Sequence, residues 1–476
     1  MLFNSLEFIL FLPTVFIFYW FVFNKDLNKQ NSLILISSYT FYGWWDIRFL
    51  FLIILSTIVD YFVGLGIYNN QNIKVRKFYL CLSIFINLGV LFFFKYFNFF
   101  IESWVELLNS FGYQQNNVWS LNLILPVGIS FYTFQTMSYS LDIYFKKISP
   151  TKDFISFATF VSFFPQLVAG PIERASSLLP QITSRRKFDL NKSTHGLRLI
   201  LWGMFKKVVI ADSLGILVNK IFLNYSTLDG GVLALGLVYF SFQIYCDFSG
   251  YSDIAIGTAK LFGFDLMSNF KLPYFSRNIS EFWRKWHISL STWFRDYLFI
   301  PLGGSKKGTW ISIRNVFCIF LVSGFWHGAN WTFIFWGLIH SLFFMPFIIK
   351  KTDKTNQSKV ISENTFFPSF QELTKVLFTY SLTTFAWVFF RSESISDSFS
   401  YIYLMFTKFS FPNNDKYGFV FILLLLAYEW SRRKDVEDII NFKNMYLRYF
   451  NYLFISYCIF AHFQLVDLSQ FIYFQF

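Results

Sequence analysis

The residue with the clearest potential for chemistry is His327, which stands in an apolar stretch over residues 316–347. An ionisable side chain at membrane depth is costly and usually faces a cavity or a partner, so a functional role is the first hypothesis. A neutral imidazole is a base near physiological pH and is suited to proton transfer. Gly324 and Gly328 form a G-x-x-x-G spacing that allows a helix or ligand to approach closely. The alternative is a structural histidine that satisfies one buried hydrogen bond.

The residues after His327 extend this candidate site. Asn330 and Trp331 follow by three and four positions, so a continuous helix would place them on the face of His327. His340 would lie about 220° away at ~100° per residue, and it is expected to be structural.

A second candidate lies in residues 281–304, EFWRKWHISLSTWFRDYLFIPLGG. At ~100° per residue, a continuous helix would bring four polar side chains within about 80° of one another. These four are Arg284, His287, Ser291 and Arg295, and Trp286 would lie with other aromatic side chains on the opposite side. The segment is too charged to span a membrane. It is expected either to lie in the interface or to line a channel, and a solvated surface helix is the simpler alternative.

Further charged residues interrupt apolar runs at three places. They are Glu173 after the run PQLVAGP (165–171), Asp247 and Asp253 at the end of one apolar segment, and Lys206 and Lys207 inside another. Lysine side chains can extend to the interface, which is the favoured interpretation for this pair. Aspartate side chains are too short to do so, and a functional role is therefore favoured more strongly for Asp247 and Asp253.

Other catalytic patterns do not occur in the sequence. It has no G-x-S-x-G elbow, no phosphate-binding glycine loop and no H-E-x-x-H pair, and its four cysteines form no C-x-x-C spacing. No metal site and no permanently bound cofactor are therefore expected.

The composition indicates which elements must position these residues. Only 14% of the 476 residues are charged and 55% are hydrophobic, whereas a soluble protein is about 25% charged. The mean hydropathy of +0.44 agrees with a chain surrounded by membrane lipid. The net charge of +13 comes from basic residues in short gaps between apolar runs, which is typical of cytoplasmic loops and not of a nucleic-acid surface.

The apolar runs predict an all-α polytopic membrane protein with about 10 to 12 transmembrane helices. The runs are residues 8–23, 32–47, 49–67, 79–100, 121–144, 154–169, 197–222, 231–246, 310–326, 329–349, 373–390, 417–430 and 447–466. The run 154–169 is expected to enter the membrane and turn back. The basic loops 25–29 and 74–77 are separated by two runs, so both are placed on the cytoplasmic side. No internal repeat is visible, and a single membrane domain over residues 1–476 is expected.

Seven ordered segments resemble the membrane-bound O-acyltransferase family, in particular its bacterial alginate O-acetylation branch. They are PVGISFYTFQTMSYSLDIY (126–144), FFPQLVAGPIER (163–174), GMFKKVVIAD (203–212), FQIYCDFSGYSDIAIG (242–257), FWRKWHISLSTWFRDYLFIPLGG (282–304), GFWHGANWTFIFWG (324–337) and WVFFR (387–391). The resemblance implies helices around a central tunnel open to both sides of the membrane, with a catalytic core at about 121–391.

The resemblance also implies two active-site histidines, His327 and His287. We interpret His327 as the base, and the role of His287 stays open between orienting the donor, stabilising a carbonyl oxyanion and holding the tunnel wall. Further candidates for the substrate or donor tunnel are Arg284, Trp286, Ser291, Arg295, Asn330, Trp331, Asp247, Asp253 and Glu173. Of these, Arg284 and Arg295 suit the phosphates of a donor.

The implied activity is transfer of an acyl group, expected to be acetyl, from a cytoplasmic thioester such as acetyl-CoA to an exported, alginate-like cell-surface polysaccharide. Peptidoglycan O-acetylation and teichoic acid D-alanylation are the alternatives within the same chemistry. A glycan or lipid transporter without acyl chemistry is the alternative class, although inverted repeats are not visible. We also expect the inner membrane of a bacterium as the location, and a separate periplasmic or membrane-anchored partner protein that completes the transfer.

Overall fold

The computed structural model describes residues 1–113, 120–121, 123–350, 360–412 and 415–463. These residues form helices and no strand, so the all-α expectation is confirmed. Residue 122 of the expected span 121–144, residues 464–466 of the span 447–466 and most of the polar stretch 350–365 lie outside this description. The helices pack into two compact units, residues 1–193 with 259–266 (unit 1) and residues 194–258 with 267–476 (unit 2). The single domain over residues 1–476 stays a prediction.

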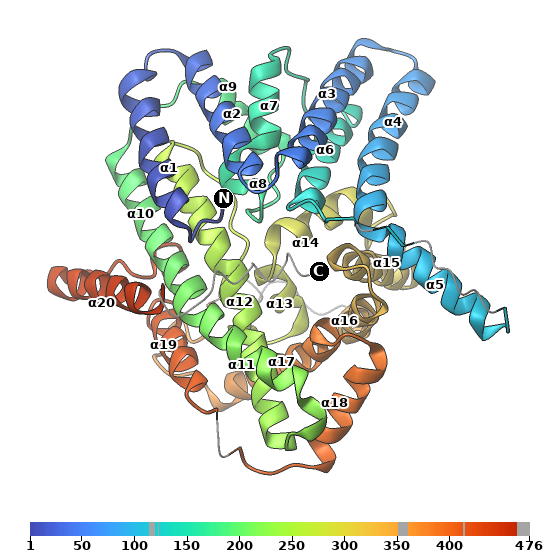
Figure 1. Cartoon of the computed structure of the whole chain (residues 1–476), viewed down its shortest axis with the longest axis vertical. Helices are drawn as coiled ribbons and strands as arrows, with labels where there is room; N and C mark the ends of the chain where they lie inside the picture. The colour runs from blue at the N-terminus through green and yellow to red at the C-terminus, as the bar shows by residue number, and fades with distance from the viewer. Residues whose placement is uncertain (114–119, 122, 351–359, 413–414, 464–476) are drawn as a thin grey trace. The chain divides into compact units, whose positions relative to one another are not determined.

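Unit 1 contains the first half of the chain. Its elements are α1 (Leu6–Ile17), η1 (Phe18–Val22), α2 (Leu27–Gly43), α3 (Ile47–Asn69), α4 (Ile73–Leu91), η2 (Phe92–Tyr96), α5 (Phe97–Ser110), α6 (Ile129–Tyr144), α7 (Phe154–Ser162), α8 (Phe164–Leu167) and α9 (Ala175–Thr183). The basic residues 25–29, at the α1–α2 connection, and 74–77, at the beginning of α4, lie at the same end of this unit (Figure 1). This arrangement fits the expectation that both loops face the same side of the membrane.

A buried polar network joins α3, α4 and α6, which pack side by side (Figure 1). The carboxylate of Asp60 accepts hydrogen bonds from Ser83, from Ser140 at 2.8 Å and from Nδ2 of Asn87 at 2.7 Å. Thr136 of α6 donates to Oδ1 of Asn87 at 3.1 Å. A carboxyl group at this depth is tolerated because both of its oxygens accept hydrogen bonds, and the network links the three helices.

The run 154–169 is interrupted between α7 and α8, and its expected turn back within the membrane stays a prediction. α7 ends at Ser162 and α8 begins at Phe164, with extended backbone at Phe163 (φ −53°, ψ 105°). The backbone N–H of Phe164 has left the helical hydrogen-bond pattern and donates to Oγ of Ser38 on α2 at 3.0 Å. A side chain of α2 therefore replaces the helical hydrogen bond.

Unit 2 contains the helices that carry the histidines. Its elements are α10 (Leu190–Met204, which begins in unit 1), η3 (Phe205–Ala211), α11 (Asp212–Leu223), η4 (Tyr225–Thr227), α12 (Gly230–Leu261), η5 (Pro273–Phe275), α13 (Ile279–Lys285), α14 (Ile288–Phe294), η6 (Arg295–Phe299), α15 (Thr309–His327), α16 (Trp331–Ile349), α17 (Phe370–Arg391), α18 (Ile395–Thr407), α19 (Gly418–Ser431), η8 (Val436–Asp438) and α20 (Met445–Phe463).

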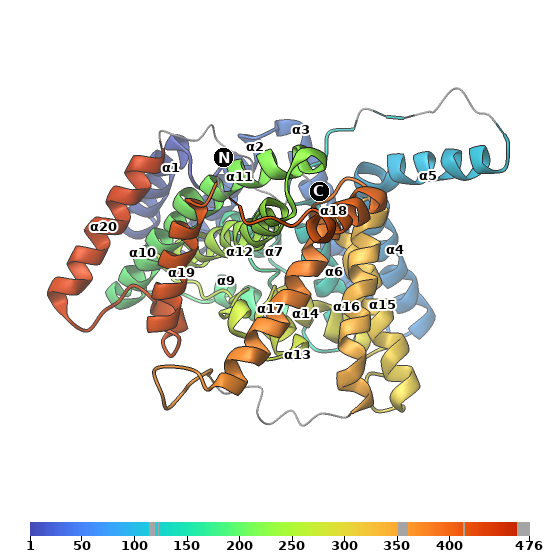
Figure 2. The ribbon, with the colours of Figure 1, turned by 90° about the horizontal axis from the view of Figure 1, so that it is seen from below.

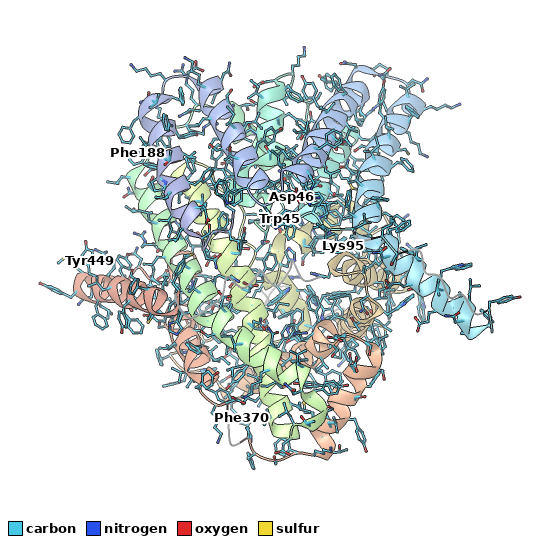
Figure 3. All side chains as sticks on the ribbon, viewed as in Figure 1. Trp45, Asp46, Lys95, Phe188, Phe370 and Tyr449 are labelled. Carbon is cyan, nitrogen blue, oxygen red and sulfur yellow. The ribbon has the colours of Figure 1, made fainter. Side chains whose placement is uncertain are left out.

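Six described helices are long and apolar enough to cross a membrane. They are residues 47–69, 73–110, 230–261, 309–327, 331–349 and 370–391, and residues 6–22, 154–167 and 418–431 form shorter apolar helices. The sequence count of about 10 to 12 included the shorter helices and more polar ones, such as α2 and α10. Large apolar side chains are exposed on the outer helices, including Phe370 of α17 and Tyr449 of α20 (Figure 3). The chain is therefore a multi-pass membrane protein.

Candidate active site

The hairpin formed by α15 and α16 places His327 at its tip. The two helices pack side by side (Figure 2) because glycines remove side chains from their interface. A Cβ at Gly324 would meet the carbonyl oxygen of Phe333 at 2.2 Å, and one at Gly337 would meet that of Phe320 at 2.2 Å. The predicted close approach at Gly324 is confirmed, and the helix that approaches is the next one in the chain.

The helix ends at His327, which corrects the expectation of one continuous helix through residue 331. Gly328 has extended backbone (φ −159°), and Asn330 caps the beginning of α16 by accepting from the N–H of Thr332 at 2.9 Å. Nδ2 of Asn330 donates to the carbonyl oxygen of Glu393 at 2.9 Å, and Trp331 is 52% exposed. The prediction that Asn330 and Trp331 share the face of His327 is therefore wrong, because helical periodicity does not extend across a break.

A second break lies at His287 and corrects the single amphipathic helix expected over residues 281–304. α13 ends at Lys285, α14 begins at Ile288, and His287 between them has left-handed backbone (φ 43°, ψ 56°). The polar stripe of Arg284, His287, Ser291 and Arg295 is consequently not formed. His287 turns inward instead and is 1% exposed.

The two breaks bring His287 and His327 together inside unit 2. Their ring centroids lie 6.3 Å apart, and the exposed fraction of His327 is 4%. Trp326 lies beside both rings, at 5.9 Å from His287 and 5.0 Å from His327. Burial lowers the pKa of His287, so this ring is neutral at physiological pH.

Aromatic side chains enclose the pair. The ring of His327 contacts Trp336 and Phe390, each at 5.3 Å, and the ring of His287 contacts Phe248 at 4.6 Å. Behind Trp336, Trp387 stacks at 5.7 Å. This enclosure was not predicted from the sequence. The available signal was the group of tryptophans within the family-like segments.

His340, expected to be structural, lies close to this enclosure. Its Nδ1 accepts a hydrogen bond from Nε1 of Trp283 at 3.3 Å, and its ring contacts Trp336 at 4.8 Å. No contact with His327 is observed in the part of the chain that the structure describes. The Trp283 bond fits the structural interpretation.

Two buried lysines correct a further expectation. Nζ of Lys206 lies 2.7 Å from Asp253, and Nζ of Lys207 lies 2.7 Å from Asp247 and 2.9 Å from Asp212. Both lysines are buried, so they do not extend to the membrane interface as predicted. Their partners are carboxylates of α12 and α11, which compensate the buried charges. Asp247 and Asp253 are thus members of ion pairs.

The remaining candidates lie at different places. Trp286 is buried against Trp387 at 5.1 Å, and Oγ of Ser291 donates weakly to the carbonyl oxygen of Trp286 at 3.4 Å. Arg284 is exposed, and the exposed Arg295 pairs with its neighbour Asp296 at 2.7 Å. Glu173 is buried in unit 1, immediately before α9.

The fold and the site define a class, a helical multi-pass membrane protein with a buried, aromatic-enclosed histidine pair. The sequence model of the membrane-bound O-acyltransferase family matches residues 117–352. Probable alginate O-acetylase AlgI of Pseudomonas putida is 40% identical over 397 residues, which cover 83% of this chain and 78% of that protein. AlgI of Pseudomonas aeruginosa is 39% identical over 410 residues, with coverages of 86% and 75%. The peptidoglycan O-acetyltransferase of Helicobacter pylori is 34% identical over 432 residues, with coverages of 84% and 78%.

The chain therefore belongs to the membrane-bound O-acyltransferase family and is an O-acyltransferase. The resemblance inferred from the seven sequence segments is confirmed.

Proposed function

We propose that this protein transfers an acetyl group from acetyl-CoA, or a similar cytoplasmic thioester, to an exported polysaccharide of the alginate type. The observation that carries this proposal is the buried pair of His287 and His327, with ring centroids 6.3 Å apart. A group that contacts both rings would be held between two imidazole side chains that aromatic rings enclose.

His327 acts as the general base in this proposal. It takes the proton of the acceptor hydroxyl as the oxygen attacks the thioester carbonyl carbon. The new C–O bond forms, the C–S bond breaks, and His327 returns the proton to the departing thiolate sulfur. No net proton is consumed, so the histidine is regenerated after each transfer.

His287 stabilises the carbonyl oxygen. A neutral imidazole has one N–H donor, and a donor aimed at a developing oxyanion in a buried site can contribute a factor of about 10² to 10³ in rate. Burial supports this role because it keeps the ring neutral without removing its N–H. Fixed backbone at the helix break holds the ring in one direction.

The enclosure favours a short acyl group. Any acyl chain beside His327 meets Trp336, Trp326 or Phe390, whose rings lie 5.0–5.3 Å from the imidazole. Trp336 is itself backed by Trp387, which is also buried. Displacing close-packed aromatic side chains to make room for a longer chain costs free energy. Acetyl fits this surrounding better than a fatty acyl chain does.

Arg284 is the better candidate of the two arginines for the phosphates of the donor. It is exposed, two residues from Trp286 and three from His287. Arg295, by contrast, is already paired with Asp296 through two hydrogen bonds of 2.7 and 3.2 Å. A planar guanidinium can bind a phosphate in bidentate fashion.

The acceptor is proposed from the relatives. Two of the relatives described above are named as alginate O-acetylases and show higher identity than the peptidoglycan O-acetyltransferase, 40% and 39% against 34%. Peptidoglycan is the second candidate because its relative covers as much of this chain. Teichoic acid D-alanylation ranks third. We place the protein in the inner membrane of a bacterium, with a separate partner protein that completes transfer on the outer side.

The test uses membranes from cells that make the full chain, so that the proposed partner protein is present, with radiolabelled acetyl-CoA. The measured quantities are free thiol released and label incorporated into alginate oligosaccharides or into peptidoglycan fragments. Thiol release that depends on His327, with label in alginate, supports the proposal. Label in peptidoglycan alone would change the proposed acceptor from alginate to peptidoglycan. Glycan transport in vesicles without thiol release would favour the transporter class.

A further inference from the structure

The break at His287 is held by a neighbouring segment outside the helices, residues 267–272 of unit 2. The backbone N–H of Lys271 donates to the carbonyl oxygen of Lys285 at 3.0 Å, and the N–H of Ile288 donates to the carbonyl oxygen of Asn269 at 2.9 Å. These two bonds stand on either side of His287. They occupy backbone groups that a continuous helix would need for its own hydrogen bonds.

The side chain of Asn269 adds a second set of bonds at the same place. Its Oδ1 accepts from the hydroxyl of Ser289 at 2.6 Å and from the N–H of Ser289 at 3.4 Å. Its Nδ2 donates to the hydroxyl of Ser252 on α12 at 3.0 Å. Asn269, Ser289 and Ser252 are all buried. One amide therefore links the first turn of α14 to α12.

This linkage explains why residues 279–294 do not form the single helix that their periodicity favours. In a continuous helix, His287 would belong to the polar stripe with Arg284 and Ser291. A left-handed backbone at a residue with a Cβ atom is disfavoured and persists only where the surroundings impose it. The bonds to Asn269 impose it here, and they turn His287 inward, where its ring centroid lies 6.3 Å from that of His327.

We propose that Asn269 is a positioning residue, which holds His287 in its left-handed conformation and so sets the geometry of the histidine pair. This inference rests on the proposed role of His287 in acyl transfer. Asn269 does not touch the reacting atoms and acts through the backbone of Ile288 and through Ser289. A misplacement of about 1 Å in a catalytic group can lower a rate about 10²-fold, so the effect of losing this anchor is large enough to measure.

The first experiment measures the conformation without using activity. In a chain whose native cysteines are replaced, His287→Cys introduces one thiol at a position where the native side chain is 1% exposed. We expect this thiol to react slowly with a small maleimide. Asn269→Ala removes the side-chain bonds to Ser289 and Ser252 but keeps the backbone bond from Ile288, so we expect the first turn of α14 to open more often and labelling to be about tenfold faster. An unchanged labelling rate would overturn the proposal. Asn269→Asp, which keeps the acceptor for Ser289, is expected to restore slow labelling.

The second experiment is a double-mutant cycle on acetyl transfer, per folded protein. In the wild-type background, Asn269→Ala is expected to lower kcat about 30-fold and to change the KM for acetyl-CoA by no more than about twofold. In a His287→Ala background, the same substitution is expected to lower kcat by less than about threefold. The control is Asn315→Ala, since Asn315 is equally buried and its Nδ2 donates to the carbonyl oxygens of Leu302 and Gly304. Its effect should be the same in both backgrounds.

If Asn269→Ala lowered kcat by the same factor in both backgrounds, Asn269 would not act through His287, and the proposal would be overturned. Failure of the proposed function looks different, because the wild-type protein would then release no thiol, or would release it independently of His327. Full activity of His287→Ala would remove the role of His287 in the reaction, while the labelling experiment would still report on its conformation.

Discussion

The rings of His287 and His327 lie 6.3 Å apart, although one residue ends a long helix and the other stands between two short helices. Each residue owes its position to a helix break. At a break, the direction of a side chain is no longer set by the helical repeat and depends instead on contacts with neighbouring elements. Both breaks are supported by polar side chains, Asn330 at the beginning of α16 and Asn269 beside α14.

Replacement of His327 by alanine tests the base. We expect acetyl transfer by His327→Ala to fall by about 10²- to 10⁴-fold, because a positioned general base typically contributes that factor. The measurement is thiol release from acetyl-CoA by protein with a normal elution profile in detergent. His462→Ala on α20 is the matched control, since its ring bonds only to the carbonyl oxygen of Cys458 among the described residues. A normal rate in His327→Ala would remove the assignment.

Trp336→Ala tests the acyl selectivity. Removal of this indole opens space beside His327, and the ratio of butyryl to acetyl transfer is expected to rise about tenfold or more, since one methylene in a tight pocket is worth about 10- to 200-fold. Parallel assays with acetyl-, propionyl- and butyryl-CoA measure it. Trp310→Ala, at an exposed tryptophan of α15, should leave the ratio unchanged. An unaltered ratio in Trp336→Ala would place the acyl chain elsewhere.

Lys207→Met tests the buried ion pairs. The change leaves the carboxylates of Asp212 and Asp247 without their shared cation, and we expect a loss of about 3–5 kcal/mol in the free energy of unfolding. Thermal unfolding in detergent, followed by tryptophan fluorescence, reports the change. Lys220→Met removes an exposed pair with Asp415 and should cost about 0–1 kcal/mol. Similar losses for the two lysines would argue against a buried, compensated cluster.

The stability of the protein should depend on pH through His287. Burial lowers the pKa of this ring in the folded state, whereas the unfolded chain has a pKa near the ordinary 6.5. The unfolded state therefore binds more protons below that value, so the contribution of His287 is fully present above about pH 6.5 and is lost as the pH falls below it. We expect the Tm to fall less between pH 7.5 and 5.5 in His287→Gln than in the wild type. If Tm depended on pH in the same way in both proteins, His287 would not be a buried, neutral histidine in the folded state.

The membrane class and the family follow from the sequence alone, and the family resemblance implied two active-site histidines, whose roles stay a prediction. Few charges and long apolar runs require a lipid environment whatever the packing, and the segments around residues 287 and 327 are specific enough to place the chain in its family. The spacing of Gly324 and Gly328 also indicated that a helix or a ligand could approach closely here, because glycine has no side chain, and the structure shows that a helix does so.

The tertiary structure decided how these residues are used. Periodicity places side chains on faces only while a helix continues, and the breaks at His287 and after His327 depend on bonds from Asn269 and on the α15–α16 hairpin. The partners of Lys206 and Lys207 on α12 lie about 40 residues further along the chain. Pairs between residues so far apart cannot be recognised from the local sequence, since only the fold brings their charges within hydrogen-bonding distance. The fold therefore decides whether a lysine extends to the membrane interface or stays buried.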